Sequence, residues 1–274
     1  MKLWCVCVLV VSWFGFSNAW AAERTSGNVL DKRLTVYGGV QAYEAEGEFS
    51  STREGRPKIE IDLDDLDLDE DETTPVLGAI FRFGKRWSLF LDYYGYHEEG
   101  VRAADFSFNF EDLTVPIGAR LDSNLDLDVY VANLSYNLIH SERARFGLGI
   151  GAHVADLELD ISASLTVDGR EIPLGEGDED LLAPLPNLYA SGAYAFTDKF
   201  ILRYGGGWMS LRSGDYDGSV VFAKAFLEYW PFRYAGFGAG YRYVEVDVDK
   251  DSGSTKEEYD VELPGPVFYA TFGF

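Results

Sequence analysis

Four carboxylate side chains near the end of the chain have the spacing of a calcium-binding loop. Asp247, Asp249 and Asp251, followed by Glu258, match the first, third, fifth and twelfth positions of an EF-hand. Ser252 stands where that loop needs Gly for its sharp turn, and the flanking residues alternate as strands do. We therefore expect no EF-hand, and keep these four residues as a loose, weakly binding site for Ca²⁺ or Mg²⁺. We expect no other cofactor.

Histidine, the side chain that most often serves acid–base catalysis, occurs at three positions: His97, His140 and His153. None of the three follows an Asp directly or two residues later. A partnership with a Ser or Asp from a distant segment stays open. Because the sequence offers no catalytic constellation, we expect a protein that is not an enzyme.

The segments that must position these side chains are short and alternating. No stretch after residue 22 approaches the ~20 consecutive apolar residues of a membrane helix. Instead, stretches of about ten residues alternate apolar and polar side chains, as in a transmembrane barrel. We predict an all-β, antiparallel, up-and-down transmembrane β-barrel with ten strands: Leu34–Phe49, Thr74–Phe83, Trp87–Glu99, Leu125–Ile139, Ala144–Ile161, Pro184–Phe196, Phe200–Leu211, Ser219–Trp230, Ala235–Val248 and Tyr259–Phe274.

The connections alternate between short turns and long polar links, the asymmetry of bacterial outer-membrane barrels. The short ones are 84–86, 140–143, 197–199 and 231–233, and we place them in the periplasm. The long ones are 50–73, 100–124, 162–183, 212–218 and 249–258. Phe106–Phe110 alternates inside a long link and could form another hairpin, so twelve strands stay open, as do eight. Asp168-Gly169 looks like a hairpin turn within an outer loop.

The first residues have the order of a secretory signal. Met1 and Lys2 precede an apolar run from Leu3 to Phe16, and an Ala-x-Ala end predicts cleavage after Ala21. We assign residues 1–21 to this signal, 22–33 to an N-terminal periplasmic segment and 34–274 to one barrel domain. The chain's two cysteines both lie inside the signal, so the mature chain would contain none.

The charge balance excludes nucleic-acid binding. Among 274 residues the formal net charge is −23, so a phosphate backbone would be repelled.

The C-terminus ends in alternating apolar residues and a terminal aromatic: Phe268, Ala270, Phe272 and Phe274. This ending resembles Gram-negative outer-membrane β-barrel proteins, in which it serves as the signal for the barrel assembly machinery. The whole mature chain resembles uncharacterised proteobacterial barrels of this kind, through segments 61–66, 151–156, 215–219 and 238–243. The resemblance implies an outer-membrane location and no established activity. Omptin proteases and lipid A deacylases share the scaffold, but the Asp-His arrangement of omptins does not occur here.

The two faces of each predicted strand exchange their apolar and polar character along its length. In the predicted strand Leu125–Ile139, one face carries Tyr130 and Leu134 and then turns acidic at Asp126 and Asp128. The opposite face turns apolar at the same level. Because a barrel continuing above the bilayer must fill its interior with apolar groups and show charges to water, we expect strands that extend beyond the membrane. The acidic collar is then a solvated face, or a site where divalent cations bridge to lipopolysaccharide.

The inward-facing positions of the predicted strands include several charged and polar side chains. They predict a polar network in the barrel lumen, made of Arg82, Asp92, His153, Arg203, Lys224, Glu228 and Arg242. Charges in a narrow barrel pair with one another or meet water, so we expect an internal salt-bridge plug. Inward Gly residues provide clearance that Tyr residues fill. We thus predict a monomeric outer-membrane protein of the cell envelope with a largely plugged lumen. A narrow solute channel or ligand-binding barrel, and a hydrolase acting on lipid A or peptides, are the alternatives.

Overall fold

The structure is a computed structural model. It describes residues 29–44, 46–53, 59–62, 71–104, 108–110, 113–167, 170–213, 216–251 and 255–274. One 3₁₀ turn, η1 (Val29–Asp31), precedes the strands β1 (Leu34–Glu44), β2 (Glu46–Arg53), β3 (Ile59–Asp62), β4 (Asp71–Phe83), β5 (Trp87–Ala103), β6 (Phe108–Phe110), β7 (Leu113–Val115), β8 (Arg120–His140), β9 (Ala144–Val167), β10 (Arg170–Ala195), β11 (Phe200–Ser213), β12 (Tyr216–Tyr229), β13 (Ala235–Asp251), β14 (Thr255–Glu262) and β15 (Gly265–Gly273).

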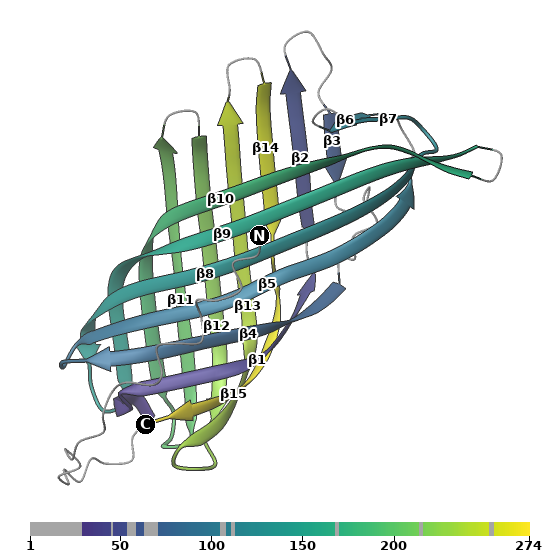
Figure 1. The fold of residues 1–274 in the computed structure, drawn as a ribbon. Coiled ribbons are helices and arrows are strands. Elements are labelled where there is room, and N and C mark those ends of the chain that lie inside the picture. The colour runs from purple at the N-terminus through teal and green to yellow at the C-terminus, as the bar shows by residue number, and fades with distance from the viewer. Residues whose placement is uncertain are drawn as a thin grey trace, which may run out of the picture.

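Ten of these strands close into an antiparallel barrel (Figure 1). The order runs β12-β11-β10-β9-β8-β5-β4-β1-β15-β13, and pairing of β13 with β12 closes the ring. The first and last strands of the barrel pair from Thr35 to Gln41 of β1, and β2 continues that seam with β14. The predicted ten-stranded, up-and-down barrel is confirmed.

The twelve-strand and eight-strand alternatives are wrong. The alternating stretch around Phe108 does form a hairpin, but β6 and β7 pair only with each other in a separate two-stranded sheet. It therefore adds nothing to the barrel wall.

One end of the barrel is built from short turns, and the other from strands that run far beyond the expected boundaries. We call them the short-turn end and the extended end. At the extended end, β9 and β10 pair from Tyr194 and Ala144 up to Arg170 and Val167, with one register shift near Gly175. The stretch 162–183, expected as a loop, is therefore mostly strand. Because an antiparallel ladder pairs backbone groups whatever the side chains are, it continues past the point where the apolar alternation fades.

The outer surface near the short-turn end carries a ring of exposed apolar side chains, which we call the apolar belt. Its members include Leu77, Phe81, Leu91, Tyr130, Leu148, Ile150, Leu188, Trp208, Leu227, Phe237 and Phe268. Apolar surface on this scale is stable only against lipid, so the belt marks the membrane-spanning part of the wall. Among the described residues there is no helix long and apolar enough to span a membrane.

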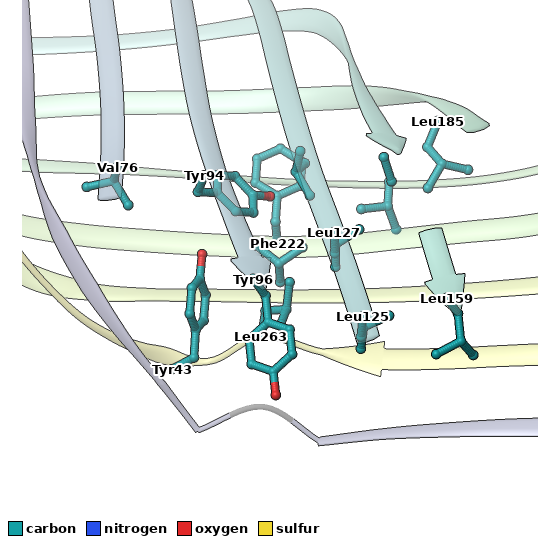
Figure 2. Packing of buried hydrophobic residues seen from close by; sticks show 14 of the residues in the cluster. Tyr43, Val76, Tyr94, Tyr96, Leu125, Leu127, Leu159, Leu185, Phe222 and Leu263 are labelled. Atoms are coloured by element: carbon teal, nitrogen blue, oxygen red, sulfur yellow. The ribbon is translucent and has the colours of Figure 1, made fainter. Parts of the chain in front are cut away.

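Above the belt the apolar side chains move to the inside, as the sequence predicts. In β8 the inward residues near the short-turn end are polar, and those toward the extended end, such as Leu125 and Leu127, are buried and apolar. These join inward residues of other strands in one cluster, the apolar core, which includes Tyr43, Tyr96, Leu159, Phe222 and Leu263 (Figure 2). Outward neighbours at this level, such as Asp156 and Asp260, are exposed to solvent. The extension of the strands beyond the belt is confirmed.

Candidate functional site: the barrel interior

The turn η1 packs into the short-turn end of the lumen. Val29 and Leu30 are buried there against Ala193, Ile201 and Trp230. This turn lies within the predicted segment 22–33, of which residues 22–28 are outside the described residues, as are residues 1–21 of the expected signal. This apolar contact holds the turn at the barrel mouth, because removing Leu30 from water is favourable by about 1.5–3 kcal/mol.

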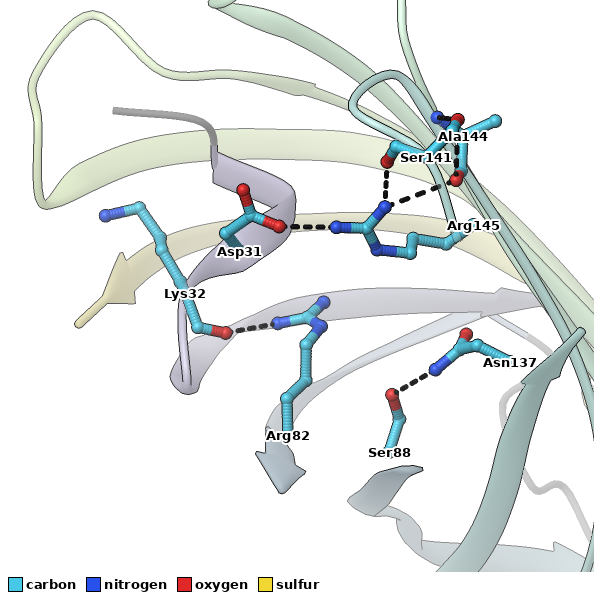
Figure 3. A network of polar contacts seen from close by, with 8 residues as sticks. All are labelled: Asp31, Lys32, Arg82, Ser88, Asn137, Ser141, Ala144 and Arg145. Carbon is cyan, nitrogen blue, oxygen red and sulfur yellow. Dashed lines mark hydrogen bonds and ion pairs between the residues drawn. The ribbon is translucent and has the colours of Figure 1, made fainter. Parts of the chain in front are cut away.

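One ion pair and one hydrogen bond to the backbone join η1 and the residue after it to the wall (Figure 3). Asp31 accepts a hydrogen bond from Arg145, whose guanidinium also donates to the Ser141 carbonyl. Arg82 donates to the Lys32 carbonyl at 2.9 Å, and Figure 3 shows the Lys32 amine directed away from Arg82. These bonds join the N-terminal segment to β4 and β9, which lie apart in the ring.

The central layer of the lumen is organised around Asp92. Lys224 Nζ lies 2.9 Å from Asp92 Oδ2, and Arg242 Nη2 lies 3.3 Å from Oδ1. Tyr37 donates its hydroxyl to Oδ1 as well. Arg242 also donates to Gln41 Oε1 at 3.2 Å. These groups project inward from four strands, β1, β5, β12 and β13, so the carboxylate links several walls of the barrel.

A second ion pair lies nearer the short-turn end. Arg203 Nε lies 2.7 Å from Glu228 Oε1, with both side chains buried. Glu228 also accepts hydrogen bonds from the Trp230 indole at 2.9 Å and the Tyr269 hydroxyl at 3.0 Å. Three donors thus surround this carboxylate, as a buried charge requires.

Two members of the predicted lumen network are not in ion pairs. Within the described part of the chain, Arg82 contacts no carboxylate and bonds only to a backbone carbonyl. His153 is buried and its Nδ1 lies 3.1 Å from the Asn187 amide nitrogen, with its ring against Phe222. The seven predicted residues therefore face one interior, but they form two separate charge clusters and two single positions.

Small cavities flank the Asp92 layer. A cavity of about 50 Å³ lies toward the short-turn end and is lined by Arg82, Ser191, Arg203, Lys224 and Glu228, among others. A second, of about 10 Å³, is lined by Asp92, Asn133, His153, Lys224 and Arg242, among others. At roughly 10–15 Å³ per water, the larger holds a few water molecules and the smaller holds one.

Glycines let large side chains lie flat across the wall. A Cβ added at Gly78 would lie 2.2 Å from the Tyr37 ring, and one at Gly238 would lie 2.2 Å from the Tyr269 ring. The two tyrosine rings are themselves 5.0 Å apart. Tyr37 donates to Asp92 and Tyr269 donates to Glu228. The two glycines therefore leave the space in which these tyrosine rings reach the buried carboxylates.

The candidate cation residues are not gathered into a ligand set. Asp249 pairs in register with Glu258 across β13 and β14, but Lys256 lies against both, 3.6 Å from Asp249. Hydrogen bonding to Glu258 raises the pKa of the Lys256 amine. Asp247 accepts instead from the Ser219 hydroxyl at 2.7 Å, and Asp251 is exposed. Among the described residues, no group of three or more His, Cys, Asp or Glu side chains converges as metal ligands would.

The outer face contains one His–Asp pair that sequence reasoning did not find. His97 Nε2 lies 3.3 Å from Asp128 Oδ1, which also accepts the Tyr93 hydroxyl at 2.7 Å. The pair joins β5 to β8, at the level where the outward residues change from apolar to acidic. His140 ends β8 at the short-turn end.

The C-terminal residues form the closing seam of the barrel. In β15, Phe268 and Phe272 are exposed on the outer face with Ala270 between them, and Phe274 follows directly after the strand. Val36 is paired with Phe272 and Val40 with Phe268, so the outward apolar row of β1 meets that of β15.

Comparison with solved structures finds a match with a TM-score above 0.5, and it shows the same fold. The outer membrane protease OmpT from Escherichia coli is similar over 88% of this chain and 97% of its own, with 9% identity and a TM-score of 0.55. The outer membrane protein OprG from Pseudomonas aeruginosa is matched over 88% of this chain and 95% of its own, with 13% identity and a TM-score of 0.40. No family model and no curated protein matches the sequence. The chain thus has the fold of outer-membrane β-barrels.

Sequence reasoning missed the plug formed by η1 and the partners Gln41, Asn187 and Trp230. The apolar pair Val29-Leu30 in an otherwise polar stretch was the available signal for the plug. Gln41 and Asn187 are inward by strand parity, and the register between strands brings them to Arg242 and His153. Trp230 lies two residues after Glu228, so this contact is local.

Proposed function

We propose that this protein is a sealed, non-enzymatic outer-membrane barrel that presents its extended end outside the cell. The short-turn end then faces the periplasm. The observation that carries the proposal is the apolar core, which fills the lumen above the membrane with packed side chains from many strands (Figure 2).

Three successive layers support a closed lumen. The turn η1 fills the periplasmic mouth, the Asp92 and Glu228 clusters cross the membrane level, and the apolar core lies above them. A hydrated ion would have to break buried ion pairs and then pass through an apolar layer, and both steps are costly.

Single-channel recording in planar bilayers tests the closure. We expect no defined conductance steps from the wild-type protein. A variant with Leu127, Leu159 and Phe222 all changed to Ala removes much of the apolar core, and we expect conductance to appear or rise in it. Regular steps from the wild-type protein would favour a narrow channel, and a melting temperature that depends on a small solute would favour a ligand-binding barrel.

The proposal includes a route to the membrane. Residues 1–21 would direct export, and the row of Phe268, Phe272 and Phe274 on the seam would be read by the barrel assembly machinery. Changing Phe274 to Ala should lower the fraction of folded, heat-modifiable barrel in cells. Changing Phe232, an exposed aromatic in a turn at the same end, is the matched control.

The outer-leaflet partner in this proposal is lipopolysaccharide, which contacts the apolar belt and the acidic residues above it. The protein acts as a monomer. If Ca²⁺ or Mg²⁺ bridges these carboxylates to lipid phosphates, chelation will lower the melting temperature in lipopolysaccharide-containing bilayers. No shift on chelation leaves the acidic residues as a solvated wall.

A hydrolase is the second candidate, and the pair of His97 and Asp128 is the observation that favours it. OmpT is a protease, but a shared fold does not transfer an activity. The pair lies on the outer wall instead of in the lumen. Turnover of lipid A or peptide that His97→Ala abolishes, while His140→Ala leaves it intact, would establish this candidate against the non-enzymatic one.

A further inference from the structure

The lumen near the short-turn end contains more positive than negative side chains. Five cationic groups lie there or in the layer above, and three carboxylates accompany them. Arg145 pairs with Asp31, Arg203 with Glu228, and Lys224 and Arg242 share Asp92, which leaves Arg82. The excess is therefore two positive charges among these lumen-facing side chains.

Arg82 is the clearest member of this excess. Its guanidinium has five donors and stays protonated, yet within the described residues it reaches only the Lys32 carbonyl. Arg82 is half-buried, and a charge held against the barrel interior without a counter-ion is costly because it loses part of its hydration.

Arg203 provides an independent sign of a missing acceptor. Its side chain is nine-tenths buried, and Nε donates to Glu228. Nη2 is also buried, and among the described residues it has no hydrogen-bond partner. Arg82 and Arg203 line the same cavity of about 50 Å³, together with Lys224 and the Ser191 hydroxyl.

The size and donors of this cavity define what it can hold. Guanidinium groups match the oxygens of phosphate and carboxylate groups better than a spherical halide. About 50 Å³ admits roughly four water-sized groups, as many as the oxygens of one phosphate. Sugars, nucleotides and lipid head groups with their glycerol are too large.

We propose that this cavity is a binding site for one small oxyanion, with Arg82 and Arg203 as its principal donors. This inference goes beyond the sealed-barrel function. A bound phosphate-sized anion neutralises the excess charge and links β4 to β11 on opposite sides of the lumen.

Refolding in different anions tests the site. The full chain is refolded from urea into a maltoside detergent in sodium phosphate or, at equal ionic strength, in sodium gluconate, whose anion is too large for the cavity. We expect phosphate to raise the melting temperature by about 5 °C or more at saturation, with acetate giving a smaller rise. Protein refolded in phosphate and then desalted should release about one equivalent on denaturation, measured by ion chromatography.

Arg82→Met is the informative variant, because Arg82 has no carboxylate that its loss would leave unpaired. It should melt higher than wild type in gluconate, and lose both the phosphate shift and the retained equivalent. Arg82→Gln, which keeps a polar side chain, should behave in the same way if the methionine variant does not fold. Arg143→Met, at an exposed turn position nearby, should respond as wild type does.

Two results would overturn the proposal. One is a wild-type protein whose melting temperature and anion content are the same in phosphate and in gluconate. The other is an equal phosphate shift in wild type and both Arg82 variants, which would mean an adventitious ion only. Neither result depends on whether the barrel conducts, so this proposal and the sealed-barrel function fail separately.

Discussion

Lys224 and Asp92 form an ion pair of 2.9 Å across the full width of the barrel. Lys224 lies on β12 and Asp92 on β5, which are five strands apart in either direction around the ring of ten. Their contact is therefore a strut between diametrically opposite walls. Arg242 contacts the same carboxylate from β13. The single acid Asp92 therefore links three strands, β5, β12 and β13.

This geometry predicts that the acid matters more than either base. Asp92→Asn leaves Lys224 and Arg242 buried without their carboxylate and should lower the free energy of unfolding by about 3–5 kcal/mol. Lys224→Met leaves Asp92 with Arg242 and Tyr37 and should cost clearly less. Urea unfolding in detergent, followed by tryptophan fluorescence, measures both. Asp198→Asn in an exposed turn is the control, and equal losses for the two lumen variants would contradict the strut.

Strand parity was enough to predict which side chains face the lumen, but not which of them meet. All seven predicted residues do point inward, since a strand's period of two is fixed by its geometry. Whether Asp92 lies level with Lys224 depends on the stagger of strands across the whole barrel. Nothing local to either residue encodes that stagger, so Arg82 was expected in a salt bridge that it does not make.

The extent of the wall was likewise only partly predictable. The boundaries of β8 near the belt agree with the expected strand to within two residues at the short-turn end, because apolar alternation is strong there. Above the belt, charged and small residues obscure the pattern, and β8 begins five residues before the expected Leu125. Backbone pairing, which sequence patterns do not report, sets that end.

A new charge should cost much more stability on the apolar belt than on the outer wall above it. Ile150 in β9 is exposed in the apolar belt, and Ile150→Arg should cost about 2–4 kcal/mol in the free energy of folding into lipid vesicles. Asp156 lies on the same face of the same strand, above the belt, so Asp156→Arg should cost less than about 1 kcal/mol. Similar losses at both positions would mean that the membrane boundary lies elsewhere.

The glycine opposite Tyr269 should not tolerate a methyl group. A Cβ at Gly238 would lie 2.2 Å from the Tyr269 ring, which holds its hydroxyl 3.0 Å from Glu228. Gly238→Ala should therefore destabilise the barrel by about 1–3 kcal/mol. In Gly38→Ala the new methyl meets the end of the Leu77 side chain at 3.2 Å and the Val76 carbonyl oxygen at 3.9 Å, and the loss should be smaller. Thermal unfolding of the two variants makes the comparison, and the reverse order would refute the packing argument.

The plug at the short-turn end should be removable without opening the barrel. Leu30 is fully buried, so Leu30→Asp places a carboxylate in an apolar contact and should displace η1. Ser191, which lines the cavity beneath the plug, can be changed to Cys as a reporter, with Cys5 and Cys7 replaced by Ser. We expect maleimide labelling of this cysteine to accelerate at least tenfold when Leu30→Asp is added, and not when Lys85→Gln, in an exposed turn, is added.

Planar-bilayer conductance of the same Leu30→Asp protein separates the plug from the apolar core. Displacing η1 exposes the larger cavity to the short-turn side, but the path beyond it still meets the Asp92 cluster and then the packed side chains around Phe222. Conductance should therefore stay at the wild-type level although labelling is fast. If conductance rises together with labelling, η1 is the barrier and the apolar core is not. If labelling is already fast in the parent protein, η1 does not seal the mouth.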